Sequence, residues 1–146
     1  MKQTIRILAA LSLCTASLGA LAAPVTVSGC WVRLLPGNLP SGAYFDVTNT
    51  GGTAIELEGV DSDAFGMAML HRSQSNGSTS TMEMVKSATV PANGTLKFAP
   101  GGYHVMLEQP KAPLKVGSTI ALTFSFSNGE KTTAQCAVKS PATMGQ

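Results

Sequence analysis

The chain has 146 residues, of which 44% are hydrophobic and 12% are charged, with 10 Lys and Arg side chains against 8 Asp and Glu. Residues 1–22 have the pattern of a cleaved secretory signal peptide, because Lys2 and Arg6 precede an apolar run and then the small residues around Ala22. Cleavage after Ala22 removes both basic side chains and leaves one domain, residues 23–146, with no net charge. This domain offers no excess of basic residues for nucleic acid or an anionic membrane surface, and no later stretch is long and apolar enough to span a membrane.

From Val25 onward, apolar and polar residues alternate in short stretches that end at turn sequences, which is typical of antiparallel β-structure. We expect Val25, Val27 and Trp31 to share one face of a first strand. Further stretches with this period contain Ala43, Phe45 and Val47, then Ile55 and Leu57, and finally Ile120, Leu122, Phe124 and Phe126. No long helical stripe interrupts the pattern, so we predict an all-β sandwich or barrel with about seven to nine strands.

Three cysteines occur, and Cys14 leaves with the signal peptide, so that Cys30 and Cys136 remain as an even pair. Exported chains are under oxidising conditions, so we expect a disulfide that ties the first strand to the last, with two free thiols as the alternative. Lipidation of Cys14 is a second alternative for the N-terminus. It is disfavoured because Leu13 stands where the lipidation motif needs a small residue.

The two histidines of the chain each lie two residues from a methionine. Residues i and i+2 of a strand point to the same face, so each such pair would project a thioether and an imidazole in one direction. Thioether sulfur is a soft, neutral ligand that favours Cu(I), and imidazole binds copper in either valence, so we predict a Cu(I) site. Two methionine–histidine pairs and one methionine pair have this spacing: Met69 and His71, His104 and Met106, Met82 and Met84.

Other functions explain these residues less well. Methionine often fills gaps in cores, so the main alternative is an exported β-sandwich without a metal that binds a protein partner through a methionine-rich apolar patch. A blue-copper electron carrier needs His and Met soon after a cysteine, and no histidine follows Cys136. A copper monooxygenase with an N-terminal histidine does not fit a chain that begins at Ala23, and neither histidine has the neighbours of a hydrolase triad. We therefore do not expect an enzyme.

The sequence separations between four of these residues are a more specific signal than the i, i+2 pairs. Ten residues separate His71 from Met82, 21 residues separate Met82 from His104, and one residue separates His104 from Met106. This spacing resembles the H(M)-x10-M-x21-H-x-M signature of the periplasmic copper chaperones of the PCuAC family. The sequences Ala68-Met69-Leu70-His71 and Pro100-Gly101-Gly102-Tyr103-His104-Val105-Met106-Leu107 also look like that family.

The resemblance implies a cupredoxin-like Greek-key β-barrel in which His71, Met82, His104 and Met106 bind Cu(I). Met69 and Met84 are not signature positions, and we interpret them as supporting or alternative donors. The family carries copper across the periplasm toward the CuA centre of cytochrome c oxidase subunit II, in cooperation with Sco-type thiol proteins. We expect a monomeric periplasmic carrier in which His104 and Met106, on a glycine-flanked turn, form the more mobile side of the site.

Overall fold

The computed structural model describes residues 24–144, so the predicted signal peptide and its cleavage site after Ala22 lie outside the described residues. In residues 24–144, no helix is long and apolar enough to cross a membrane. The chain forms strands β1 (Val25–Arg33), β2 (Ser41–Asn49), β3 (Ile55–Asp61), β4 (Phe65–Ser75), β5 (Ser80–Met84), β6 (Ala88–Val90), β7 (Gly94–Phe98), β8 (Tyr103–Pro110), β9 (Thr119–Phe126) and β10 (Lys131–Lys139).

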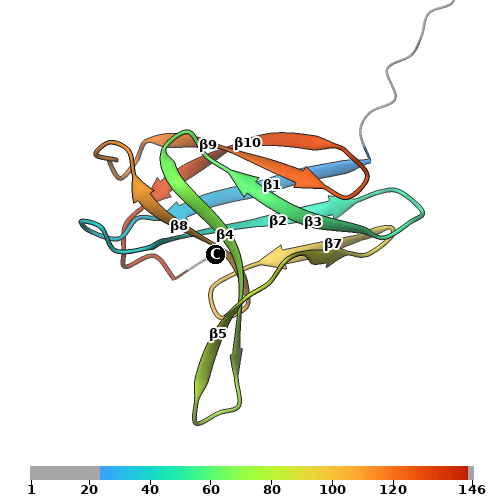
Figure 1. Cartoon of the computed structure of the whole chain (residues 1–146), viewed down its shortest axis with the longest axis horizontal. Helices are drawn as coiled ribbons and strands as arrows, with labels where there is room; N and C mark the ends of the chain where they lie inside the picture. Colours follow the sequence, from blue (N-terminus) through green and yellow to red (C-terminus); the bar gives the residue numbers. More distant parts are fainter. Residues whose placement is uncertain (1–23, 145–146) are drawn as a thin grey trace, which may run out of the picture.

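All ten strands belong to one hydrogen-bonded sheet that curls around its own core (Figure 1). Their order is β5-β4-β8-β7-β2-β1-β10-β9-β3-β6, with β1 and β10 parallel and most other neighbours antiparallel. Strand β3 lies near β4, and β6 lies near β7 and β2, so the two halves of the sheet face each other. The predicted all-β fold is confirmed. The strand number exceeds the prediction because β6 and β7 have only three and five residues, too few for a clear period.

Aromatic rings from three strands meet at the centre of the core. The Phe45 and Phe98 rings stack with their centroids 4.4 Å apart, and Phe124 meets Phe45 edge-on at 4.7 Å. Strand β9 has the buried face that its alternation predicts, since four of its side chains are buried: Ile120, Leu122, Phe124 and Phe126. Offset and edge-on ring pairs add to the stability that burial alone gives. This core supports the sheet on which the candidate site lies.

The first strand differs from the prediction. The pairing of β1 with β2 shifts register between Ser28 and Trp31, where Gly29 has a φ of +60°, which favours glycine. The extra residue reverses the alternation, so Val32 enters the core. The Trp31 ring instead packs on the other face against Tyr44, with ring centroids 4.5 Å apart. The expectation that Trp31 shares a face with Val25 and Val27 was therefore wrong, because the period alone does not show a bulge.

The predicted disulfide is present. Cys30 on β1 and Cys136 on β10 are bonded, with Cα atoms 4.5 Å apart. The two strands are parallel neighbours in the sheet, and Cys136 is fully buried. The bond therefore joins the first strand to the last, as the cysteine pairing predicts.

Candidate metal centre

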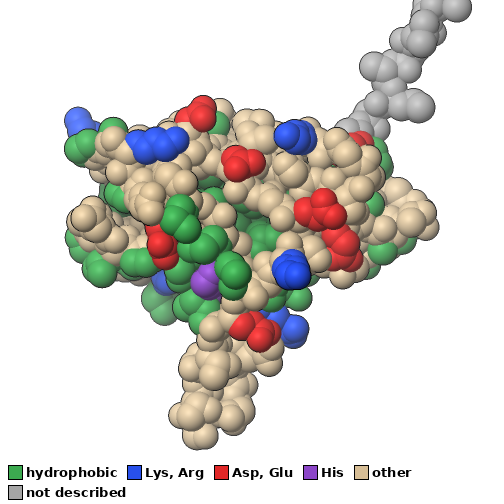
Figure 2. Space-filling model, in the orientation of Figure 1, with side chains coloured by type: hydrophobic (Ala, Val, Ile, Leu, Met, Phe, Trp, Pro, Cys, Tyr) green, Lys and Arg blue, Asp and Glu red, His purple; other side chains and the backbone are tan. Residues whose placement is uncertain are grey.

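Three neighbouring strands carry the histidines and five of the methionines. Strand β4 lies between β8 and the edge strand β5, and both pairings are antiparallel. The hairpin of β4 and β5 projects from the body of the molecule (Figure 1). The space-filling view shows histidine within a patch of hydrophobic side chains just above this hairpin (Figure 2). The donors thus gather where the hairpin leaves the barrel.

The strand register brings the candidate donors to one face. Residues that lie opposite each other on antiparallel strands point to the same side, as do residues i and i+2 of one strand. The His71 and His104 rings lie with their centroids 5.7 Å apart. The cross-strand pairs are His71 with His104, Met69 with Met106, His71 with Met84, and Ser73 with Met82.

A tight turn sets the position of His104. Gly101 has a φ of +85°, and the Gly102 amide donates to the Ala99 carbonyl at 3.0 Å, which matches a type II turn with Pro100 at its second position. The Gly102 carbonyl then lies 3.0 Å from His104 Nδ1. A carbonyl can only accept, so Nδ1 carries the proton and the Nε2 lone pair is free for a ligand.

The His71 ring differs from the His104 ring in the hydrogen bonding of its Nδ1 atom. Its buried Nδ1 has no hydrogen-bond partner within the described residues. Burial lowers the pKa of His71 below its ordinary value of 6.5, the neighbouring His104 lowers it further, and Glu108 acts in the opposite sense. The imidazole is therefore kept neutral, which is the form that binds a metal. A metal ion bound at His71 Nδ1 would satisfy this unpaired polar atom.

Exposure increases from β8 toward β5. His104 is only 7% exposed, whereas Met82 and Met84 are 53% and 69% exposed. All five residues of β5 are exposed, and β5 pairs only with β4. The turn and the Gly102 carbonyl hold His104 in place, so the structure gives no support to the expectation that His104 and Met106 form the more mobile side. The exposed edge of the candidate centre is β5.

Sequence reasoning missed Tyr44, which borders the centre on the β2 side. Its ring lies 6.4 Å from the His104 ring, and its hydroxyl accepts a hydrogen bond from Arg33 Nη2 at 2.9 Å. Burial raises the pKa of Tyr44 above 10.0, against the opposing effect of Arg33. Gly42 lies opposite Met106, and a Cβ there would be 2.6 Å from the Tyr44 hydroxyl. Glycine at position 42 therefore leaves room for the Tyr44 side chain, which a Cβ there would force to shift.

We expect Gly101→Ala to lower the free energy of unfolding by about 1–2 kcal/mol, because an L-residue with a positive φ is strained. Gly102→Ala is the matched control. Its Cβ would meet only the Ala99 carbonyl oxygen, at an ordinary 3.7 Å, and its φ is not positive. Urea unfolding of both variants measures the effect. Equal stability of the two variants would show that the turn does not depend on the conformation of Gly101.

A family model described as "Putative lipoprotein LpqE-like" matches residues 25–138, from the first strand to the last. The chain belongs to the LpqE-like family. A relative named "Putative lipoprotein Lxx21020", from Leifsonia xyli subsp. xyli (strain CTCB07), is 41% identical over 117 residues, 79% of this chain and 69% of the relative. Both descriptions read "putative lipoprotein", and lipoproteins are exported, which agrees with the predicted export of this chain.

Solved structures relate this LpqE-like chain to PCuAC domains. The structure of CuI-DR1885 from Deinococcus radiodurans is 35% identical, with a TM-score of 0.68, and the match covers 88% of this chain and 87% of that chain. The copper-bound PCuAC domain from PmoF2 has a TM-score of 0.68 at 24% identity, covering 81% of this chain and 94% of that domain. These neighbours confirm the PCuAC resemblance and the cupredoxin-like fold of this LpqE-like chain.

Proposed function

We propose that the protein is an exported copper chaperone that carries Cu(I) on His71, Met82, His104 and Met106. The main support is the convergence of two imidazoles and several thioethers on one face of β4, β5 and β8. One imidazole has its Nε2 lone pair free, and the other has a buried Nδ1 without a partner. The copper-bound structures of related domains also support the proposal.

The donor set suits a carrier of Cu(I). Thioether and imidazole are neutral ligands, and the soft sulfur atoms favour Cu(I) over Mg²⁺, Ca²⁺ or Zn²⁺. Thiolates would bind Cu(I) more tightly, but they oxidise readily outside the cytoplasm, and both cysteines of the described chain are in a disulfide. A centre with an exposed edge lets the ligand of an acceptor enter before a thioether leaves. Copper then moves by ligand exchange, without catalysis of a reaction.

We propose that the chaperone acts in the periplasm as a monomer and delivers Cu(I) toward the CuA centre of cytochrome c oxidase, on subunit II. Sco-type thiol proteins would act in the same delivery. The support for this destination is the resemblance of the His71, Met82, His104 and Met106 spacing to the PCuAC signature. An acceptor would approach at β5, where the exposed thioethers lie.

A second candidate function follows from the same exposure. Met67, Met82 and Met84 are 40%, 53% and 69% exposed, and exposed methionine side chains can contribute to a binding surface for a protein. In that case the methionines would contact a partner without any metal. Metal binding distinguishes the two functions, because a contact surface has no need of two imidazoles beside the thioethers.

The test is an anaerobic titration of the exported chain with Cu(I) against a chelator of known affinity. We expect the wild type to retain one equivalent and Met82→Leu to compete about tenfold less well or worse, since one ligand is lost. Met144→Leu is the matched control, because Met144 is 77% exposed and lies far from the three strands in sequence. A wild type that cannot hold one equivalent would refute the copper function, and a Met82 variant that competes equally well would show that Met82 is not a required ligand.

A further inference from the structure

The geometry points to a second position for Cu(I) in the same centre, formed by Met69, Met106, His71 and His104 on β4 and β8 alone. This inference rests on the proposed copper function and adds a donor outside the signature. In this position, Met69 replaces Met82 as a ligand when the bond between Cu(I) and Met82 on strand β5 breaks. The ligands on β4 and β8 can then hold Cu(I) while strand β5 moves aside for an acceptor.

The register supports Met69 more directly than Met82. His71 lies opposite His104 and Met69 lies opposite Met106, so these four side chains form two adjacent rows on one face. Side chains opposite each other on neighbouring strands have Cβ atoms about 4.5–5.5 Å apart. Met82 is on β5, two strands from β8, which corresponds to about 9–10 Å between strand axes. Met69 is therefore the thioether nearest to Met106 by strand position.

Burial and strand order divide the donors into a sheltered group and an exposed group. Met69, Met106 and His71 are half-buried, and His104 is buried. Strand β8 is held on both sides, by β4 on one side and by β7 and β2 on the other. Strand β5 is an edge strand whose residues are all exposed, and such strands open at lower free-energy cost than central ones. Met82 is therefore the ligand that leaves the ion most easily, and Met69 is in the sheltered group that can replace it.

The exchange step is simple in its chemistry. The bond between Cu(I) and Met82 Sδ breaks, and a bond between Cu(I) and Met69 Sδ forms. Both ligands are neutral thioethers, so the copper keeps its oxidation state and no proton moves. A donor from the acceptor can then approach from the side that β5 vacates.

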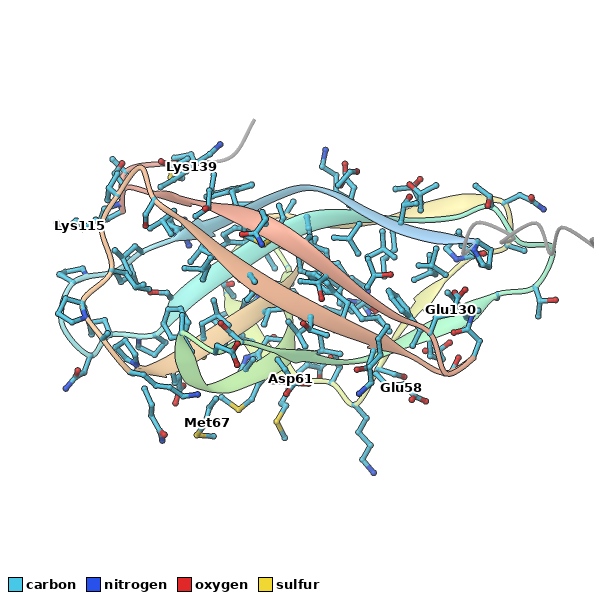
Figure 3. The ribbon with its side chains drawn as sticks, turned by 90° about the horizontal axis from the view of Figure 1, so that it is seen from above. Glu58, Asp61, Met67, Lys115, Glu130 and Lys139 are labelled. Carbon is cyan, nitrogen blue, oxygen red and sulfur yellow. A yellow bond between two sulfur atoms is a disulfide. The ribbon has the colours of Figure 1, made fainter. Side chains whose placement is uncertain are left out.

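The first experiment uses Met82→Leu with ¹³C-labelled methionine methyl groups and Ag(I), a redox-inert substitute for Cu(I). We expect the Met69 methyl resonance to shift on addition of one equivalent of Ag(I). The Met67 methyl is the internal control, because Met67 is on the same strand, is 40% exposed, points outward in Figure 3, and lies opposite Glu108 rather than a donor. An unmoved Met69 resonance, with Ag(I) bound elsewhere, would overturn the inference.

The second experiment measures Cu(I) affinity by chelator competition in double variants. We expect Met69→Leu with Met82→Leu to bind about tenfold more weakly than Met82→Leu alone, because the two thioethers substitute for each other. Met67→Leu with Met82→Leu should match Met82→Leu alone. Equal affinity of the Met69 and Met67 double variants would overturn the inference and leave the copper function intact. Only a wild type that holds no Cu(I) would refute the function itself.

Discussion

His104→Ala is expected to lower the affinity for Cu(I) by about a hundredfold or more, which corresponds to about 3 kcal/mol or more of binding free energy. The histidine offers an Nε2 lone pair, because its Nδ1 proton is held by the Gly102 carbonyl at 3.0 Å. No other histidine besides His71 exists to replace it. Alanine removes both the ligand and the hydrogen bond that orients it. Anaerobic competition with a chelator measures the loss.

His104→Asn separates these two contributions. An asparagine amide can still donate to the Gly102 carbonyl but offers no imidazole nitrogen for copper. We expect His104→Asn to bind Cu(I) as weakly as His104→Ala while its free energy of unfolding stays closer to that of the wild type. If His104→Asn keeps the affinity of the wild type, His104 is not a copper ligand.

Removal of the disulfide should have the largest effect on folding. We expect Cys30→Ala with Cys136→Ala to lower the free energy of unfolding by about 4–5 kcal/mol, because the bond closes a long loop in the unfolded chain. The two cysteines are 106 positions apart, so the bond constrains most of the domain. Urea unfolding of the double variant and of the oxidised wild type gives the difference.

The reduced wild type is the control for the double variant, since it keeps both side chains without the bond. Cys136 is fully buried, so its replacement by alanine also leaves a small void. We expect the reduced wild type to account for most of the loss. The donors are on β4, β5 and β8, whereas the bond joins β1 to β10, so the folded double variant should bind Cu(I) as the wild type does. A loss below about 1 kcal/mol would contradict the loop-closure explanation.

The sequence predicted the fold class from local alternation, and it predicted the disulfide from the even pair of cysteines in an exported chain. Alternation at Ile120, Leu122, Phe124 and Phe126 fits a strand with one buried face, and all four side chains are buried. The bulge at Gly29 was not predictable from the period, because one inserted residue reverses every later position. Short strands such as β6 were missed because three residues carry too little pattern.

The sequence predicted which residues form the candidate centre but not how they are arranged across the strands. The i, i+2 spacing predicted that each methionine–histidine pair shares a face, and the register agrees. It could not show that Met69 lies opposite Met106, because cross-strand register depends on turns far along the chain. Tyr44 was missed because alternation places it outside the core, although it is only 3% exposed. Its burial comes from Trp31 and Arg33 on the neighbouring strand.

The glycine-rich turn beside His104 has a defined geometry in the folded chain. Glycines beside His104 predicted mobility, since glycine has wide conformational freedom. In the folded chain, Gly101 uses that freedom to adopt one positive φ, and the turn it makes fixes the Gly102 carbonyl against the imidazole. The exposed side of the centre is instead β5, which pairs with a single neighbour.

X-ray absorption at the copper edge, on the exported chain loaded with one equivalent of Cu(I), tests the central claim most directly. We predict a first shell of imidazole nitrogen and thioether sulfur, with less nitrogen in His104→Ala and less sulfur in Met106→Leu. A shell without sulfur, or a shell that neither substitution changes, would contradict a Cu(I) centre on β4, β5 and β8.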